Sequence, residues 1–329
     1  MDIQDRRGLK IAAARRLEDA PNAQRIVLLW AGASAALSLL VSFLSFLLDG
    51  QIESTGGLSG IGLRSLLETA QSLLSVVSFA LLPFWNLGYT ACTLRFARGE
   101  ETTHKDLLRG FRRFRPALRM MVLRYFLYMG IVIGVFYIGL AILSMTPLAG
   151  PFYSIIEGQE EALLAGAVSE EVMFSAMESV IPMLVICGII CVVAVLPLFY
   201  RLRLAEFRIM DEPECRARAA LRDSGRMMRR RRWKLALLDL SFWWYFLAEL
   251  VAAVLCYGDT ILAAIGVELP FGTDAAFFLF YVLGMLAQVL VIYLRGNYVQ
   301  TTYAMFYQVL RQEQQTIENT VALRANGEV

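Results

Sequence analysis

The sequence has little of what most catalytic and metal-binding sites are built from. Its 329 residues include one histidine, His104, and contain neither H-E-x-x-H nor G-x-S-x-G. A lone histidine leaves no second imidazole for a zinc site, and an enzyme built from this chain would need an unfamiliar arrangement of groups. We therefore predict a protein with no enzymatic activity, no metal and no cofactor.

Cysteine is also scarce. Four of the five cysteines lie in or at the edge of apolar runs, namely Cys92, Cys187, Cys191 and Cys256. This placement implies no disulfide framework. Two of them, Cys187 and Cys191, share a helix face at a spacing of four, which is compatible with a soft-metal site or with two small buried side chains. We favour burial.

Charge is the third scarcity. Charged residues make up 18% of the chain and apolar residues 57%, and the mean hydropathy is +0.55. A soluble domain has about 45–50% apolar and about 25% charged residues. This excess of apolar residues predicts a protein whose solvent is the lipid bilayer.

Six apolar runs are long enough to cross a bilayer. A helix needs roughly 20 residues to span a hydrocarbon core about 30 Å thick, and lipid cannot satisfy the backbone of an open strand. We predict an all-α fold, a polytopic membrane helix bundle that forms a single integral membrane domain over residues 1–329. The predicted transmembrane helices cover about 26–48, 70–94, 119–144, 180–201, 234–256 and 275–297.

Basic residues occur almost entirely in alternate loops. Of the 31 Lys and Arg residues, 6 precede the first run, 9 lie between Arg95 and Arg124, and 12 lie between Arg201 and Lys234. The opposite loops contain only Arg64. Because cytoplasmic loops of membrane proteins carry the excess of Lys and Arg, we predict that both termini and both basic loops are cytoplasmic.

The six runs also follow a repeating pattern. Each odd-numbered run follows a basic, helix-prone segment, and each even-numbered run ends in an aromatic stretch that carries arginine. The pattern predicts three hairpins of the same orientation, with cytoplasmic amphipathic helices at about 103–118 and 213–230. Apolar stripes support these helices: Leu107, Leu108, Phe111, Phe114 and Leu118 in the first, and Ala217, Leu221, Ser224 and Met228 in the second.

Arginines of these basic segments are candidate contacts to anionic lipid headgroups. They lie within a few residues of membrane helices, so lipid phosphate is a nearer ligand than nucleic acid, which we do not expect to bind. Topology signalling alone would produce the same charges. The candidates are Arg109, Arg112, Arg113, Arg115, Arg229, Arg230, Arg231 and Arg232.

Polar side chains inside the runs are candidate functional groups because they are costly in lipid. At about 1.5 Å per residue, Asp239 lies roughly 8 Å from the cytoplasmic edge, and the other members lie at similar depths. The predicted polar layer comprises Asn86, Arg124, Asp239, Gln288 and Arg295. It forms either a cytoplasm-facing cavity, with Asp239 paired to Arg295 or Arg124, or a polar clamp between helices. We favour the clamp.

Two further features of the runs carry expectations. Glu249 lies roughly 22 Å from the cytoplasmic edge, where no basic residue is predicted, and is a candidate proton-coupling carboxylate. Gly130 and Gly134 form a small-x-x-x-small face in the third run, for which close helix packing is the expected use.

Two stretches resemble a known family. Residues 219–247 read AALRDSGRMMRRRRWKLALLDLSFWWYFL, and residues 293–307 read YLRGNYVQTTYAMFY. These are similar to domain of unknown function 975, a bacterial family of uncharacterised multi-span membrane proteins. Positions that match its pattern include Ala220, Leu221, Ser224, Met228, Leu238, Leu240, Ser241, Phe242, Trp244, Tyr298, Thr302, Ala304, Phe306 and Tyr307.

The resemblance has two departures. Arg229 to Arg232 replace a G-x-K segment of the family pattern, and Asn297 replaces a proline. What the resemblance implies is a multi-pass protein of the bacterial cytoplasmic membrane, with no catalytic residue to carry over.

These observations favour one function and leave a second open. We predict a non-enzymatic membrane protein of the bacterial cell envelope, a scaffold or regulatory component that engages a membrane protein partner or anionic lipid through its basic cytoplasmic helices. The alternative is a small transporter or permease subunit with a cytoplasm-facing polar cavity. Substrate, partner and oligomeric state do not follow from the sequence.

Overall fold

A computed structural model of the chain describes residues 6–54, 61–150, 153–154, 170–212, 214–267 and 273–325. These ranges contain helices and no strands. The main elements are α1 (Arg6–Glu18), α2 (Ala23–Ser54), α3 (Ile61–Arg98), η2 (His104–Leu108), α4 (Arg109–Arg112), α5 (Phe114–Ser144), η3 (Pro147–Ala149), α8 (Glu170–Leu202), α9 (Ala205–Asp211), α10 (Ala217–Met227), α11 (Arg232–Leu240), α12 (Trp243–Leu255), α13 (Gly258–Ala264), α14 (Thr273–Val291) and α15 (Asn297–Ala325).

The predicted spans correspond to helices of the structure. Five helices are long and apolar enough to cross a membrane, over Ala23–Leu48, Leu63–Arg98, Phe114–Ser144, Val180–Asp211 and Ala275–Val321. A sixth crossing is obtained when α11 and α12 are taken together. The all-helical membrane fold is therefore confirmed. Each of the five continuous helices extends past at least one of its predicted ends, because it continues into polar sequence.

The fifth span differs from the predicted continuous helix over 234–256. Its two halves, α11 and α12, meet at a bend of 65°. The helix stops at Leu240 and restarts at Trp243, so Ser241 and Phe242 form the break. Four bulky aromatic residues follow one another from Phe242 to Tyr245. Such residues have lower helix propensity than straight-chain residues.

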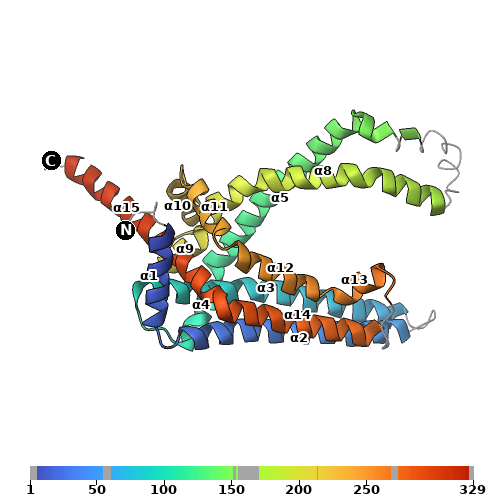
Figure 1. Cartoon of the computed structure of the whole chain (residues 1–329), viewed down its shortest axis with the longest axis horizontal. Helices are drawn as coiled ribbons and strands as arrows, with labels where there is room; N and C mark the ends of the chain where they lie inside the picture. The colour runs from blue at the N-terminus through green and yellow to red at the C-terminus, as the bar shows by residue number, and fades with distance from the viewer. Residues whose placement is uncertain are drawn as a thin grey trace.

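Helix pairs that are consecutive in the predicted topology pack together: α2 with α3, α5 with α8, and α12 with α14. Figure 1 shows α2, α3, α12 and α14 running alongside one another, whereas the α5–α8 hairpin diverges from them. In the same view (Figure 1) the N mark lies near α1 and the C mark lies past the end of α15, both on the left, at the end of the molecule that contains α1, α10 and α11. We call this the basic end. The internal sequence repeat stays a prediction.

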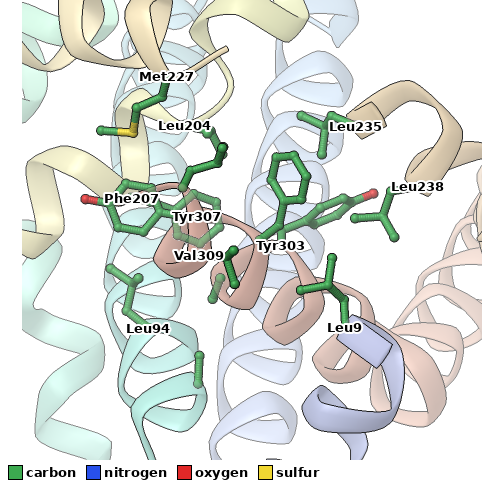
Figure 2. Packing of buried hydrophobic residues seen from close by; sticks show 14 of the residues in the cluster. Leu9, Leu94, Leu204, Phe207, Met227, Leu235, Leu238, Tyr303, Tyr307 and Val309 are labelled. Atoms are coloured by element: carbon green, nitrogen blue, oxygen red, sulfur yellow. The ribbon is translucent and has the colours of Figure 1, made fainter. Parts of the chain in front are cut away.

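A core at the basic end joins the hairpins (Figure 2). It surrounds α15, whose Val299, Tyr303, Phe306 and Leu310 recur at helical spacing and are almost completely buried. Side chains from α1, α3, α9 and α11 pack around them. Because burying one such side chain contributes about 1.5–3 kcal/mol, this core holds the hairpins together at one end.

The last crossing continues out of the apolar region as α15. A π-helical turn over Ile292–Gly296 joins α14 to α15. Such turns insert one residue into the helical repeat and are found often at functional sites. Here the turn packs against α2.

The predicted amphipathic helix over 103–118 is not continuous. A 3-10 turn, η2, is followed by the short helix α4, and the chain breaks at Arg113 before α5 starts. Its predicted apolar stripe is therefore divided, with Leu107 buried while Leu108 and Phe114 are exposed. The second predicted helix, over 213–230, corresponds to α10, which buries the whole predicted stripe of Ala217, Leu221, Ser224 and Met228.

Candidate functional site

The basic end of the molecule contains a network of ion pairs around Asp211, the last residue of α9. The Tyr307 hydroxyl donates a hydrogen bond to Asp211 Oδ2 over 2.9 Å, and Arg98 pairs with Oδ1 of the same carboxylate. Tyr307 is fully buried, so its hydroxyl needs this acceptor. The C-terminal ends of α3 and α9 and the interior of α15 are thereby joined at one carboxylate.

A second carboxylate, Glu212, extends the network. It pairs with Arg208 of α9 and with Arg311 of α15, and Arg208 Nε also lies 3.4 Å from Asp223 Oδ2 of α10. Arg208 is buried, which is tolerated because its guanidinium is surrounded by acceptors. These pairs connect α10 to α15.

A cavity of about 350 Å³ lies beside this network. Its lining is polar and consists of Arg98, Asp211, Glu212, Tyr307, Gln308, Arg311, Gln312 and Gln315. Each arginine of the lining is already paired with one of its two carboxylates, Arg98 with Asp211 and Arg311 with Glu212. Its charge is neutralised internally, so we assign the cavity a structural role at the junction of α3, α9 and α15.

Asp239 of the predicted polar layer bridges two other helices. Its Oδ1 accepts a hydrogen bond from the Tyr303 hydroxyl over 2.6 Å, and Tyr200 is also hydrogen-bonded to it. Neither of the predicted cationic partners, Arg295 or Arg124, forms its ion pair. A different guanidinium contacts this group, that of Arg203, which lies 4.6 Å from the centroid of the Tyr303 ring.

Arg124 is paired elsewhere. Its Nη1 lies 2.5 Å from Glu206 Oε1, in the first turn of α9. The pair joins α5 to α9 and supplies the charged partner that a guanidinium near the membrane requires. The sequence prediction that Arg124 belongs near the inner edge is compatible with this contact, but its partner was missed.

The other members of the predicted layer lie apart from these contacts. Asn86 is exposed on α3 and accepts a hydrogen bond from Trp30 Nε1 over 3.2 Å. Gln288 is half-buried in α14, and Arg295 is exposed in the π-helical turn. The predicted layer is therefore divided into separate interhelical contacts, and the cavities described here are lined by other residues.

Glu249 lies in α12, on the membrane side of the helix break. Tyr245, one turn earlier, is hydrogen-bonded to this carboxyl group. The Oε1 atom of Glu249 is buried and has no hydrogen-bond partner in the part of the chain that the structure describes. A half-satisfied carboxyl in an apolar helix is costly, so Glu249 remains a candidate proton-coupling residue.

Three of the predicted lipid-contacting arginines are used inside the fold. Arg113 Nη1 donates to the Ile209 carbonyl (2.5 Å) and to the Glu212 carbonyl (2.8 Å), which completes the C-terminal end of α9. Burial and the neighbouring Arg109 lower the pKa of Arg113. Arg109 Nε lies 2.9 Å from Asp106 Oδ1, and Arg231 pairs with Glu313 of α15.

The remaining arginines of that set are arranged differently. Arg112, Arg115, Arg229 and Arg230 are exposed, and the described residues offer none of them an ion-pair partner. Arg232 is half-buried, and its Nε has no hydrogen-bond partner. The four exposed arginines are the members of this set that a ligand outside the described chain can reach.

Asp106 holds the turn before α5 in place. Its Oδ2 accepts the Thr103 N–H over 2.8 Å, and its carboxylate pairs with Arg95 and Arg109 over 2.9 Å each. Burial raises the pKa of Asp106, but the Thr103 hydrogen bonds and the two guanidinium charges outweigh burial and hold the pKa below its usual value.

The two cysteines of the fourth span, which stand four residues apart, pack against α5. Cys187 Sγ faces Gly139, and Cys191 Sγ lies 3.8 Å from the Val132 carbonyl. Both are buried. Within the described residues no group of three or more His, Cys, Asp and Glu side chains is placed to hold a metal ion.

Sequence reasoning missed the acidic residues of the basic end. Glu206, Asp211 and Glu212 lie in a stretch rich in arginine and were outweighed there by positive charge. A signal was present, because these carboxylates stand three to four residues from Arg203 and Arg208, the spacing at which charges meet on a helix.

Comparison with known proteins gives one match. The sequence model of a family described as a protein of unknown function (DUF975) matches residues 22–314, which is most of the chain. No curated protein and no solved structure matches it.

Proposed function

The chain belongs to the DUF975 family of proteins of unknown function, and from that premise we propose that it is a non-enzymatic scaffold or regulatory protein of the bacterial cytoplasmic membrane. In this proposal the basic end faces the cytoplasm and binds the anionic surface of the inner leaflet. A membrane protein partner is the other ligand that such a scaffold would engage. The contacts described above support the lipid surface more directly.

The observation that carries the proposal is the division of arginines at the basic end into two groups. One group forms ion pairs or hydrogen bonds inside the fold and comprises Arg98, Arg113, Arg124, Arg208 and Arg311. Arg112, Arg115, Arg229 and Arg230 are exposed without a described partner. A basic residue near an anionic membrane surface contributes about 1 kcal/mol of attraction.

The position of these groups supports a membrane ligand. Arg112 and Arg115 flank the start of α5, and Arg229 and Arg230 precede α11, so both pairs stand where a crossing leaves the bilayer. Figure 1 marks both ends of the chain at this end of the molecule, which agrees with six crossings, the number obtained when α11 and α12 count as one span. Placing this end in the cytoplasm agrees with the positive-inside rule.

Lipid analysis after gentle extraction tests the proposal. The full chain is extracted from bacterial membranes into polymer-bounded discs, and its lipids are compared with those of the same membranes by mass spectrometry. We expect enrichment of anionic phospholipid around the wild type. Replacing Arg112, Arg115, Arg229 and Arg230 with Gln should reduce the enrichment, whereas Arg64→Gln at the opposite end should not. Wild-type discs with the bulk lipid composition would refute the proposal.

A second function, that of a small transporter or permease subunit, is favoured by one observation. The fifth span is broken at Ser241 and Phe242, and broken helices often form binding sites in transporters. Glu249 would then be the proton-coupling group. Single cysteines at Asn86, Gln288 and Glu249, tested with a membrane-impermeant maleimide from each side, decide between the two. Labelling at Asn86 and Gln288 from the cytoplasmic side would favour transport, since it would reveal a water-filled cavity.

A further inference from the structure

The largest of the grooves described here lies between the start of α5 and the connection from α9 to α10. Its volume is about 910 Å³. One wall consists of the first three turns of α5, and the other consists of the residues that lead into α10. It is distinct from the neutralised cavity beside Asp211, with which it shares no lining residue.

One end of this groove is strongly basic. Four arginines line it, Arg115 and Arg119 from α5 and Arg216 and Arg218 from α10 and its N-cap. All four are exposed, and none has an ion-pair partner among the described residues. Glu214 is the one acidic side chain that lines the groove in the described part of the chain. The groove therefore presents an excess of positive charge.

Two helix N-termini add to this charge. The N-cap residues of α5 and α10 are Arg113 and Arg216, neither of which caps its helix through a side-chain hydrogen bond. Neither helix has an acidic residue in its first turn. Unsatisfied N–H groups and the helix dipole attract anions at such ends, and here they act on the same groove as the arginines.

The groove changes character along α5. Beyond Arg119 its wall on α5 consists of apolar side chains, among them the exposed Val122 and Phe126, the latter of which is 66% exposed. From Arg115 to Phe126 a helix rises about 16 Å, at about 1.5 Å per residue. Because α5 is a membrane-spanning helix, this apolar part continues into its lipid-facing surface.

From this combination we infer that the groove between α5 and α10 binds one anionic phospholipid, with its phosphate among Arg115, Arg119, Arg216 and Arg218 and an acyl chain along Val122 and Phe126. A soluble phosphate would occupy only the arginine-lined part of the groove and leave its apolar wall uncovered. An acidic peptide is less suitable, because the apolar wall of the groove belongs to α5, a helix long and apolar enough to cross a membrane. The inference rests on the proposed function and assigns it a specific site.

A matched pair of variants isolates the groove from general surface charge. Arg119→Gln/Arg218→Gln removes two charges from the groove, and Arg15→Gln/Arg222→Gln removes two exposed, unpaired charges at the same end but outside it. Each purified full-length protein is titrated with dioctanoyl phosphatidylglycerol, and bound lipid is counted by native mass spectrometry. We expect one tightly bound lipid on the wild type and the control, and affinity weaker by on the order of tenfold for the groove variant.

The outcomes separate the two proposals. Equal lipid affinity in both double variants would overturn the assignment of the lipid to the groove, even where the wild type enriches anionic lipid. Wild-type discs without enrichment of anionic phospholipid would instead refute the proposed function. Displacement of the lipid by glycerol phosphate at the same concentration would also overturn the inference, since it would show a phosphate site without an acyl-chain contact.

Cys215 provides an independent readout, because it lines the groove and is half-buried while the other four cysteines are buried. Burial raises the pKa of its thiol, so labelling by a neutral maleimide should be slow and measurable. We expect discs containing anionic lipid to protect Cys215 relative to discs of zwitterionic lipid. The Arg119→Gln/Arg218→Gln variant should lose this protection, and protection that persists in it would contradict the inference.

Discussion

Lys10 Nζ donates a hydrogen bond to the Ser241 carbonyl over 3.0 Å, and so connects the first helix of the chain to the break in the fifth span. The same ammonium lies 4.1 Å from the centroid of the Phe242 ring. Arg6 donates to the Leu237 carbonyl over 3.3 Å. A helix that ends inside an apolar region leaves carbonyls without partners, and α1 supplies cations to two of them.

Removing this contact should loosen α1. We expect Lys10→Ala to lower the free energy of unfolding by about 1 kcal/mol, since a cation at a helix C-terminus contributes on that scale. Thermal unfolding in discs and hydrogen exchange of α1 measure the effect. Arg7→Ala is the matched control, because Arg7 is exposed on the same helix. Equal behaviour of the two variants would contradict the role of Lys10.

The Tyr303 hydroxyl should matter more than its ring. Tyr303→Phe keeps the packing but removes a donor 2.6 Å from Asp239, leaving the carboxylate short of a partner. We expect a loss of about 1–3 kcal/mol of stability. Tyr298→Phe is the control, since no hydrogen-bond partner of its hydroxyl lies among the described residues. A Tyr303→Phe variant as stable as Tyr298→Phe would show that Asp239 does not depend on this hydrogen bond.

Close backbone packing depends on glycines that differ from the predicted pair. A Cβ atom at Gly110 would lie 1.9 Å from the Phe84 carbonyl oxygen, and one at Gly88 would lie 1.7 Å from that of Leu107. A Cβ at Gly130 or Gly134 would meet nothing within 4 Å. We expect Gly110→Ala to cost at least about 1–3 kcal/mol and Gly130→Ala to be neutral, as measured by thermal unfolding. A neutral Gly110→Ala would show that α3 and α4 can separate without loss.

Asp106 should make stability depend on acid pH. Its pKa in the folded protein is held below 3.8, so it contributes stability that is present above that pH and is lost as pH falls through the folded pKa. The difference in unfolding temperature between the wild type and Asp106→Asn should be constant from pH 7 to about pH 5 and shrink below about pH 4. A difference that already disappears near pH 6 would point to another group.

The helix break, the glycine contacts and the divided helix at 103–118 share a reason for escaping sequence-based prediction. Each depends on what lies opposite. Gly110 differs from Gly130 only in its neighbours, and the chain is interrupted at Arg113 because that side chain reaches the carbonyls of Ile209 and Glu212. Helical periodicity identifies an apolar stripe, as it did for α10, but it does not say which other element covers the stripe.

The sequence alone determined that this chain is an all-helical membrane protein of its family. The free energy of transfer into lipid is a sum over neighbouring residues, so it can be calculated for any window of about 20 residues. Only the tertiary structure decided the partners: Tyr303 for Asp239, Glu206 for Arg124, and internal carbonyls for Arg113, while Arg115 and Arg119 stayed exposed. Pairing depends on how each helix is rotated about its axis, by about 100° per residue, and on which helices meet. Those are properties of the assembled bundle.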